Sequence, residues 1–288
     1  MEVEQQGLYL MTIVCSLISM LACCFVLLTC GVTGMWKCSS IRLMMYLTLG
    51  NILTGITLLL PTYKYEFLCS FQVHLLHFCL VGQIILSTLF MHFCYMKTVQ
   101  EQAFTIRTEI MYLGIVLIPS LLASIPPFIS ENVGNNCWDN NYSPLQDAVS
   151  SVGYLFIYLA CFLFSLSCYL GTMVNLSLFP KGYYTEEFES KLEKMRMTGK
   201  FTIMYFGLGM ILFIYSTLEL VDRHKQGMDF IAMFCQASCG TLTFMLYLSS
   251  DKVKKGMKRF FKDKSVVSDF SVQPENPSII EDSAYSLK

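Results

Sequence analysis

Long runs of apolar residues, separated by short polar stretches, cover most of the chain. Seven runs are long enough to cross a bilayer as helices, since about 20 apolar residues suffice. Ten-residue segments of alternating polarity, the pattern of a membrane barrel, do not occur in the sequence. The pattern therefore predicts an all-α membrane protein, a seven-transmembrane helix bundle. Its predicted spans are residues 8–34, 41–63, 69–96, 109–130, 148–178, 201–220 and 228–249.

The third run, from Cys69 to Lys97, differs from a plain lipid-facing helix because polar residues interrupt it. Polar groups at membrane depth are costly unless they face other helices or a wet cavity. We therefore expect this helix to run through the middle of the bundle. The polar residues within it are His74, His77, Gln83, Ser87 and His92.

Prolines mark several expected helix ends. The second run is bounded by Pro61, and the fifth ends at Pro180. The fourth contains Pro119 and the pair Pro126–Pro127, which we expect to kink or end that helix near its outer end.

Lysine and arginine are distributed unevenly among the connecting segments. With an extracellular N-terminus, only Lys64, Arg223 and Lys225 of the 20 basic residues lie outside. Cytoplasmic loops carry the excess of basic residues. The distribution predicts a multi-pass protein of the plasma membrane, with the N-terminus extracellular and the C-terminus cytoplasmic.

The segment after the seventh run is basic and amphipathic. Its apolar residues can share one face, with lysines at the flanks, which predicts a short helix at residues 251–263 lying on the inner leaflet. Residues 264–288 are rich in serine, and we expect them to be disordered. The chain thus divides into a bundle, 1–250, this surface helix and a cytoplasmic tail. The inner loop 181–200 is predicted to extend the fifth or sixth helix.

Composition supports a membrane protein. Of the 288 residues, 54% are hydrophobic and 14% are charged, against about 25% charged residues in soluble domains. The net charge of −1 gives no indication of nucleic-acid binding. The 13 cysteines contain no CxxC pair, and we expect no metal site and no cofactor. Motifs of membrane enzymes, such as HExxH and GxSxG, do not occur, so we expect no enzyme. The first run is too long for a signal peptide.

Two cysteines stand at informative places in this topology. Cys69 opens the third run, and Cys137 lies in the outer loop between the fourth and fifth. This placement resembles the disulfide of G-protein-coupled receptors, and the resemblance implies a Cys69–Cys137 bridge. The alternative is two unrelated thiols. The step Cys137–Trp138 is similar to one found in this loop of the secretin, adhesion and cyclic-AMP receptor classes.

Within that family, the resemblance favours a cyclic-AMP receptor-like or secretin-like group over the rhodopsin-like class. The place of the rhodopsin-like Asp-Arg-Tyr triplet reads HFCYMK here, and the seventh run contains no proline. The chain instead resembles the cyclic-AMP receptor-like or secretin-like group at Gln236, Gly240 and Tyr247, which a basic helix follows. The resemblance implies that an extracellular ligand acts through this chain on a heterotrimeric G protein.

Candidate ligand-binding residues lie in the outer half. His74 and His77 are three residues apart on one helical face, where they either contact a ligand or bond to neighbouring helices. Glu219 and Asp229 bracket an outer loop, and either close a ligand pocket or are solvated. Asn141 belongs to a glycosylation sequon in the longest outer loop.

Candidate coupling residues lie at the inner ends. His92 stands where secretin-like classes keep a polar lock, and the alternative is a packing role. Five basic residues either pair with carboxylates of a G protein or anchor the helices at the membrane surface. They are Lys97, Arg107, Lys194, Arg196 and Lys200. Asn51 and Gln236 are expected to form hydrogen bonds between helices.

Other classes of membrane protein fit less well. A retinal-binding pump needs a lysine in the seventh run, and residues 230–250 contain none. A transporter or channel, the main alternative, favours mid-membrane charges or an internal repeat. Neither occurs in the sequence.

Overall fold

The computed structural model describes six continuous stretches of the chain and several shorter pieces. All secondary structure among these residues is helical. The chain divides into the units Met1–Ser250 and Asp251–Lys288, and all the helices named below belong to the first. The described residues are 2–60, 66–102, 104–129, 144–177, 202–211 and 226–249, together with 192, 195, 196, 198–200, 214 and 253.

Helices occupy the described parts of all seven predicted runs. Five of them, α1 to α5, contain stretches long and apolar enough to cross a membrane. Between α5 and α7, residues 202–211 form a further helical segment where the sixth span is predicted. The labelled helices are α1 (Glu2–Val32), η1 (Met35–Lys37), α2 (Ser39–Leu58), α3 (Glu66–Thr98), α4 (Ile106–Ile129), α5 (Pro144–Ser177) and α7 (Gln226–Ser249).

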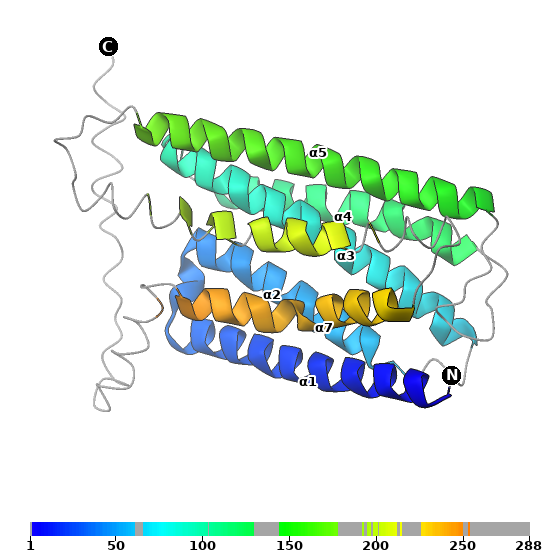
Figure 1. Ribbon diagram of the computed structural model, residues 1–288. Coiled ribbons are helices and arrows are strands. Elements are labelled where there is room, and N and C mark those ends of the chain that lie inside the picture. Colours follow the sequence, from blue (N-terminus) through cyan, green and yellow to red (C-terminus); the bar gives the residue numbers. More distant parts are fainter. Residues whose placement is uncertain are drawn as a thin grey trace, which may run out of the picture. The chain divides into compact units, whose positions relative to one another are not determined.

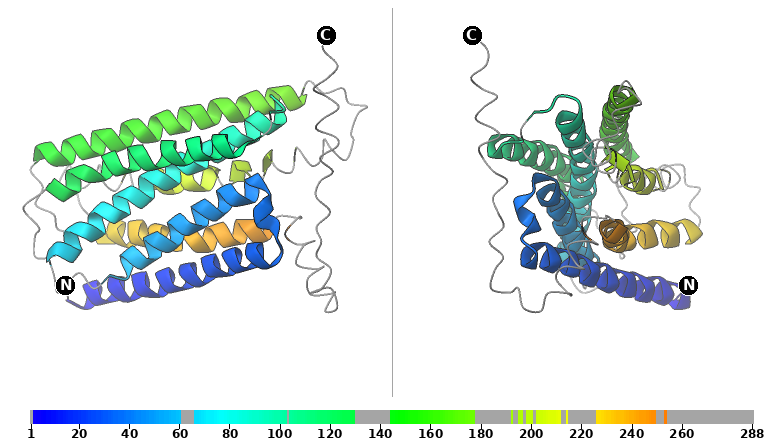
Figure 2. Two further views of the ribbon diagram at one scale, coloured as in Figure 1. Left: turned by 180° about the vertical axis from the view of Figure 1, so that it is seen from behind. Right: turned by 90° about the vertical axis from the view of Figure 1, so that its left-hand side faces the viewer.

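Successive helices run in alternating directions along the bundle (Figures 1 and 2). The first helix, α1, packs on both α2 and α7, while α3 packs on α2, α4 and α5. Of the span in α3, 72% is buried, against 50% in α2, 28% in α1 and α4, and 22% in α5. The prediction that this polar-studded helix runs through the middle of the bundle is therefore confirmed.

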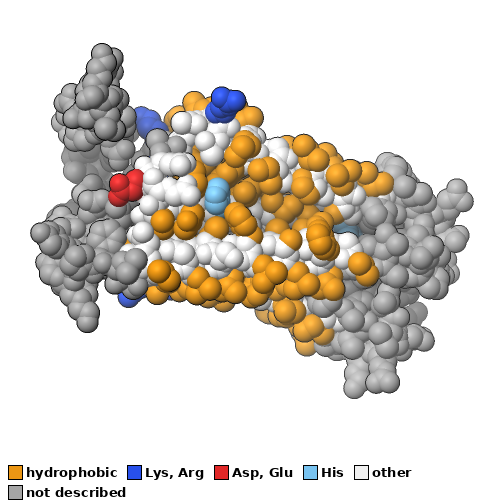
Figure 3. Space-filling model, turned by 90° about the horizontal axis from the view of Figure 1, so that it is seen from above, with side chains coloured by type: hydrophobic (Ala, Val, Ile, Leu, Met, Phe, Trp, Pro, Cys, Tyr) orange, Lys and Arg blue, Asp and Glu red, His pale blue; other side chains and the backbone are white. Residues whose placement is uncertain are grey.

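Apolar side chains form much of the outer surface. Figure 3 shows hydrophobic side chains along the middle of one face, with the charged side chains in view confined to its left-hand half. On α5, for example, Val152, Phe156 and Leu163 are 64%, 72% and 59% exposed. Such a surface is suited to hydrocarbon rather than to water.

The described basic residues gather at one end of the bundle, where α1 and α3 end and α2 and α4 begin. Thr198 lies at this end too, because its hydroxyl is 3.1 Å from the Cys94 thiol near the end of α3. The grouping matches the uneven distribution on which the predicted orientation depends. The described basic residues at this end are Lys37, Arg42, Lys97, Arg107, Arg196 and Lys200.

The helix ends agree with most of the proline predictions. Helix α2 ends at Leu58, before Pro61, and α5 ends at Ser177. Helix α4 continues through Pro119 and reaches Ile129, two residues beyond the proline pair. The Ser120 hydroxyl donates to the Val116 carbonyl at 2.6 Å, the kind of side-chain contact that helps a membrane helix to accommodate proline. Most of 181–200 and of 251–263, and all of 264–288, lie outside the described residues.

Candidate functional site

A buried polar network joins α2, the segment 202–211 and α7. The Asn51 side-chain amide donates to the Tyr205 hydroxyl at 2.9 Å and to the Thr243 hydroxyl at 3.0 Å. The Tyr205 and Thr243 hydroxyls are 3.0 Å apart. Relative exposure is 2% for Asn51, 3% for Tyr205 and 0% for Thr243, so the network lies inside the bundle.

The direction of the hydrogen bonds follows from the Thr243 hydroxyl. It donates to the Cys239 backbone carbonyl at 2.9 Å, and therefore accepts from Asn51 and Tyr205. The Asn51 side-chain carbonyl oxygen, 3.3 Å from the Tyr205 hydroxyl, is a second acceptor within reach of that hydroxyl. The expectation that Asn51 bonds between helices is thus confirmed, and three helical segments are held in one relative position.

Replacing Asn51 with Leu is expected to lower the free energy of unfolding by about 1 kcal/mol, because Tyr205 and Thr243 lose an interhelical donor away from water. The thermal unfolding midpoint of the purified protein measures this change. Substituting Leu for Asn at a buried position also tests packing, so Thr243→Val, which keeps the size and removes the hydroxyl that accepts from Asn51, is the matched variant. Midpoints equal to that of the wild type in both variants would contradict a stabilising network.

Further bonds connect α3 to α2. The Gln83 amide donates to the Thr54 hydroxyl at 3.0 Å. Nearer the start of α3, the Gln72 amide donates to the Thr57 backbone carbonyl at 2.8 Å. Both glutamines are buried, with relative exposures of 5% and 2%. The polar residues of α3 therefore bond to its neighbours, as a central membrane helix requires.

Histidines of α3 contact α4 and α5. His74 Nδ1 lies within hydrogen-bonding distance of the Ser124 backbone carbonyl, and His77 is partly buried nearby in the sequence. Towards the basic end, His92 Nδ1 is 2.5 Å from the Tyr112 hydroxyl. The His92 ring centroid is also 5.5 Å from that of Phe164 in α5. His74 thus bonds to a neighbouring helix, and His92 both hydrogen-bonds to α4 and packs against α5.

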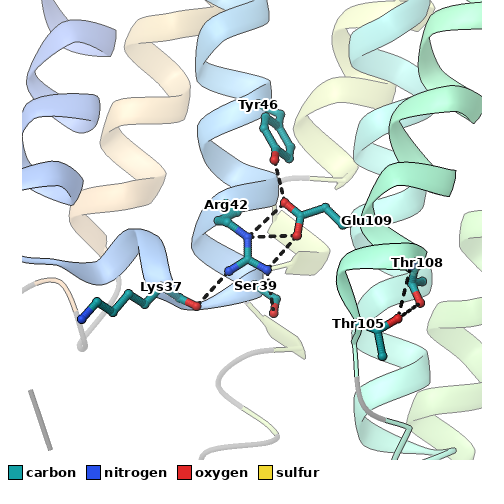
Figure 4. A network of polar contacts seen from close by, with 7 residues as sticks. All are labelled: Lys37, Ser39, Arg42, Tyr46, Thr105, Thr108 and Glu109. Atoms are coloured by element: carbon teal, nitrogen blue, oxygen red, sulfur yellow. Dashed lines mark hydrogen bonds and ion pairs between the residues drawn. The ribbon is translucent and has the colours of Figure 1, made fainter. Parts of the chain in front are cut away.

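An ion pair links α2 to α4 at the basic end (Figure 4). Arg42 Nε is 3.0 Å from both carboxylate oxygens of Glu109, and Arg42 Nη2 donates to Glu109 Oε2 at 2.7 Å. The Tyr46 hydroxyl donates to Glu109 Oε1 at 2.6 Å. Arg42 Nη1 also donates to the Lys37 backbone carbonyl at 2.9 Å, which connects the turn before α2.

This ion pair is stronger than an ordinary surface pair. The Glu109 side chain is only 9% exposed, and that of Arg42 is 25% exposed. A multidentate guanidinium–carboxylate contact combines charge with fixed geometry. Its contacts suit it to positioning two helices rather than to catalysis. Among the described residues, no group of three or more His, Cys, Asp or Glu side chains forms a cluster that could hold a metal ion.

The structure places the other predicted residues as follows. Lys97 lies in the last turn of α3 and Arg107 in the first turn of α4, and both are exposed, as are Arg196 and Lys200. Gln236 is partly buried in α7. Cys69 and Asp229 lie near the starts of α3 and α7, but their side chains are outside the description. Residues wholly outside it are Cys137, Asn141, Lys194 and Glu219.

Sequence reasoning missed the partners that complete these contacts. Arg42 counted only as one of the basic residues placed on the cytoplasmic side, and Tyr205 and Thr243 resemble ordinary members of apolar runs. One signal was present: Glu109 is an acidic residue at the basic end of a predicted span, and an acid at a membrane boundary indicates a partner.

Comparisons with known proteins do not add a family to this description. No protein-family model matches the sequence, and no curated protein matches it.

Proposed function

We propose that this chain is a G-protein-coupled receptor of the plasma membrane, with seven membrane spans, an extracellular N-terminus and a cytoplasmic C-terminus. The observation that carries the proposal is the helix arrangement. The central helix α3 is enclosed by its neighbours, α1 contacts α7 at the closure of the bundle, and a buried polar network joins α2, 202–211 and α7.

Contacts of Thr198 and of the segment 202–211 support a sixth span at this place in the bundle. Thr198 contacts Cys94 of α3, and the Tyr158 hydroxyl of α5 donates to the Phe206 backbone carbonyl at 2.9 Å. Tyr205 reaches Asn51 of α2 and Thr243 of α7. The segment therefore bridges the α3–α5 side to the α2–α7 side, so its displacement would change contacts across the bundle.

Such directional contacts suit a protein with two alternative packings. A ligand shifts an equilibrium between two states by the difference in its affinity for them. Hydrogen bonds between helices are either made or broken, so they favour discrete states over continuous deformation. In this proposal, an extracellular ligand acts near His74, His77, Glu219 and Asp229, and a heterotrimeric G protein binds at the basic end, near His92.

The finer assignment to a cyclic-AMP receptor-like or secretin-like group rests on the sequence resemblance. A Cys69–Cys137 disulfide belongs to the same proposal. The described side chains contain no disulfide, and eleven cysteines among them are free thiols. Cys137 and the side chain of Cys69 lie outside the described part of the chain, so the bridge stays a prediction. Asn141 is the proposed glycosylation site of the outer loop.

Measurement of nucleotide exchange tests the proposed function. Membranes containing the full chain are assayed with each class of heterotrimeric G protein, against a ligand library that includes cyclic nucleotides. We expect ligand-dependent exchange at verified surface abundance. A chain that stays silent with every G protein, but mediates solute or ion flux in reconstituted vesicles, would instead be a transporter or channel.

A triple replacement of Lys194, Arg196 and Lys200 by Ala is expected to keep normal surface abundance and lower agonist-driven nucleotide exchange. These cations can form charge-assisted bonds with carboxylates of a partner. Surface labelling and exchange are measured on the same cells, with Lys37→Ala as the single-cation control. Full exchange at normal abundance would remove this loop from the coupling surface, and reduced abundance would indicate membrane anchoring instead.

A further inference from the structure

We propose that the membrane-facing surface over His92, between α4 and α5, binds an anionic glycerophospholipid of the surrounding bilayer. This surface, called the His92 surface below, is formed by His92 of α3, Arg107 and Met111 of α4, and Phe164 of α5. The proposal concerns recognition of lipid and does not depend on coupling to a G protein.

The His92 surface arises because α4 and α5 both pack closely on α3 but only slightly on one another. His92 lies where the three helices meet, with ring centroids 5.8 Å from Tyr112 of α4 and 5.5 Å from Phe164 of α5. Its side chain is only partly buried, and Phe164 is 47% exposed.

The contacts of Tyr112 determine which His92 nitrogen carries the proton. Tyr112 is 1% exposed, and its hydroxyl has one hydrogen-bond partner among the described residues, His92 Nδ1. A buried hydroxyl hydrogen needs an acceptor, so the tyrosine donates and Nδ1 accepts. A neutral imidazole with an accepting Nδ1 carries its hydrogen on Nε2. Nε2–H is therefore a donor that no other described side chain or carbonyl meets.

A donor facing hydrocarbon needs an acceptor supplied by the membrane, because an unsatisfied polar group there is costly. The ester carbonyls of a glycerophospholipid are acceptors of this kind. They lie between the phosphate layer and the acyl chains, and the exposed Phe164 and Met111 side chains, 47% and 53% exposed, offer apolar contacts to those chains.

Charge and depth favour an anionic phospholipid. Arg107 is exposed on the same face of α4 as Ile110 and Met111, and can meet a phosphate. Tyr112, which bonds to His92, lies five residues further along α4, which is about 7.5 Å of helix rise. The interfacial layer of a bilayer is about 5–8 Å thick on each side. A lipid phosphate at Arg107 therefore places its ester carbonyls near His92.

Native mass spectrometry of the full chain, released from micelles that contain phosphatidylglycerol or phosphatidylcholine, tests this site. We expect the wild type to retain phosphatidylglycerol preferentially. His92→Asn keeps an acceptor for Tyr112 near the position of Nδ1 and removes the outward donor. His92→Asn and Arg107→Gln are each expected to weaken retention about fivefold, the factor that losing one hydrogen bond produces.

Arg196→Gln, which removes an exposed cation that belongs to neither α4 nor α5, is the matched control and should retain lipid as the wild type does. Arg107 lies outside the packed interior, so its variant decides the question even if His92→Asn unfolds. Equal retention by Arg107→Gln and the wild type would overturn the proposal. Displacement of the phospholipid by cholesterol would also overturn it, because a sterol has no phosphate for Arg107.

Discussion

Glu109→Ala is expected to lower the free energy of unfolding by about 2–3 kcal/mol, because it leaves the Arg42 guanidinium without its carboxylate at a mostly buried position. The thermal unfolding midpoint should fall by about 4–8 °C for a chain of this size. Reaction of the buried cysteine thiols with a fluorogenic maleimide reports the unfolding. Cys23, Cys79 and Cys239 become accessible only when helices separate.

Three companion variants separate the ion pair from other effects. Tyr46→Phe removes one hydrogen bond to Glu109 and should cost about 1 kcal/mol. Lys97→Ala removes an exposed cation at the same end and should change stability by less than about 0.5 kcal/mol. The double variant Arg42→Met with Glu109→Leu leaves no uncompensated charge, so it should be more stable than Glu109→Ala. If Glu109→Ala were no less stable than Lys97→Ala, the ion pair would contribute nothing measurable.

The sequence predicted the position of most helices and the central place of α3. The helices follow from long apolar runs separated by polar stretches, and the place of α3 follows from the polar residues within its run. Boundaries were less accurate. The third run was predicted to begin at Cys69, but α3 begins at Glu66, and the fourth was predicted from 109, but α4 begins at Ile106. Helices extend beyond their apolar spans into the interface, where charged residues are tolerated, so hydropathy alone does not mark their ends.

The specific partners of polar side chains could not be read from the chain. Asn51 was expected to bond between helices, but a tyrosine and a threonine within apolar runs give no sign that they face it. Arg42 and Glu109 are 67 residues apart, and their pairing requires α2 and α4 to lie side by side at the same end. For His92, the residue type indicated a polar contact, while the choice of Tyr112 depended on how α3 and α4 rotate about their axes.

Gly240 is expected to be one of the positions in the bundle least tolerant of substitution. A Cβ atom at this position would meet the Ser19 hydroxyl, lie 2.6 Å from the Cys23 thiol and lie 2.9 Å from the Ser19 backbone carbonyl. Side chains can rotate away, but the backbone oxygen moves only if α1 shifts relative to α7. Small residues at membrane helix interfaces allow such close approach.

The expected result of Gly240→Ala is therefore destabilisation by about 1–3 kcal/mol, although alanine favours the helix by about 1 kcal/mol over glycine. Gly114→Ala in α4 is the matched control, because nothing lies within 4 Å of a Cβ at that position. The control should gain up to about 1 kcal/mol from helix propensity alone. Thermal unfolding midpoints of both variants are measured in the same detergent. The midpoint should fall for Gly240→Ala and rise slightly for Gly114→Ala. If Gly240→Ala were as stable as Gly114→Ala, α1 and α7 would not be in close contact at Gly240.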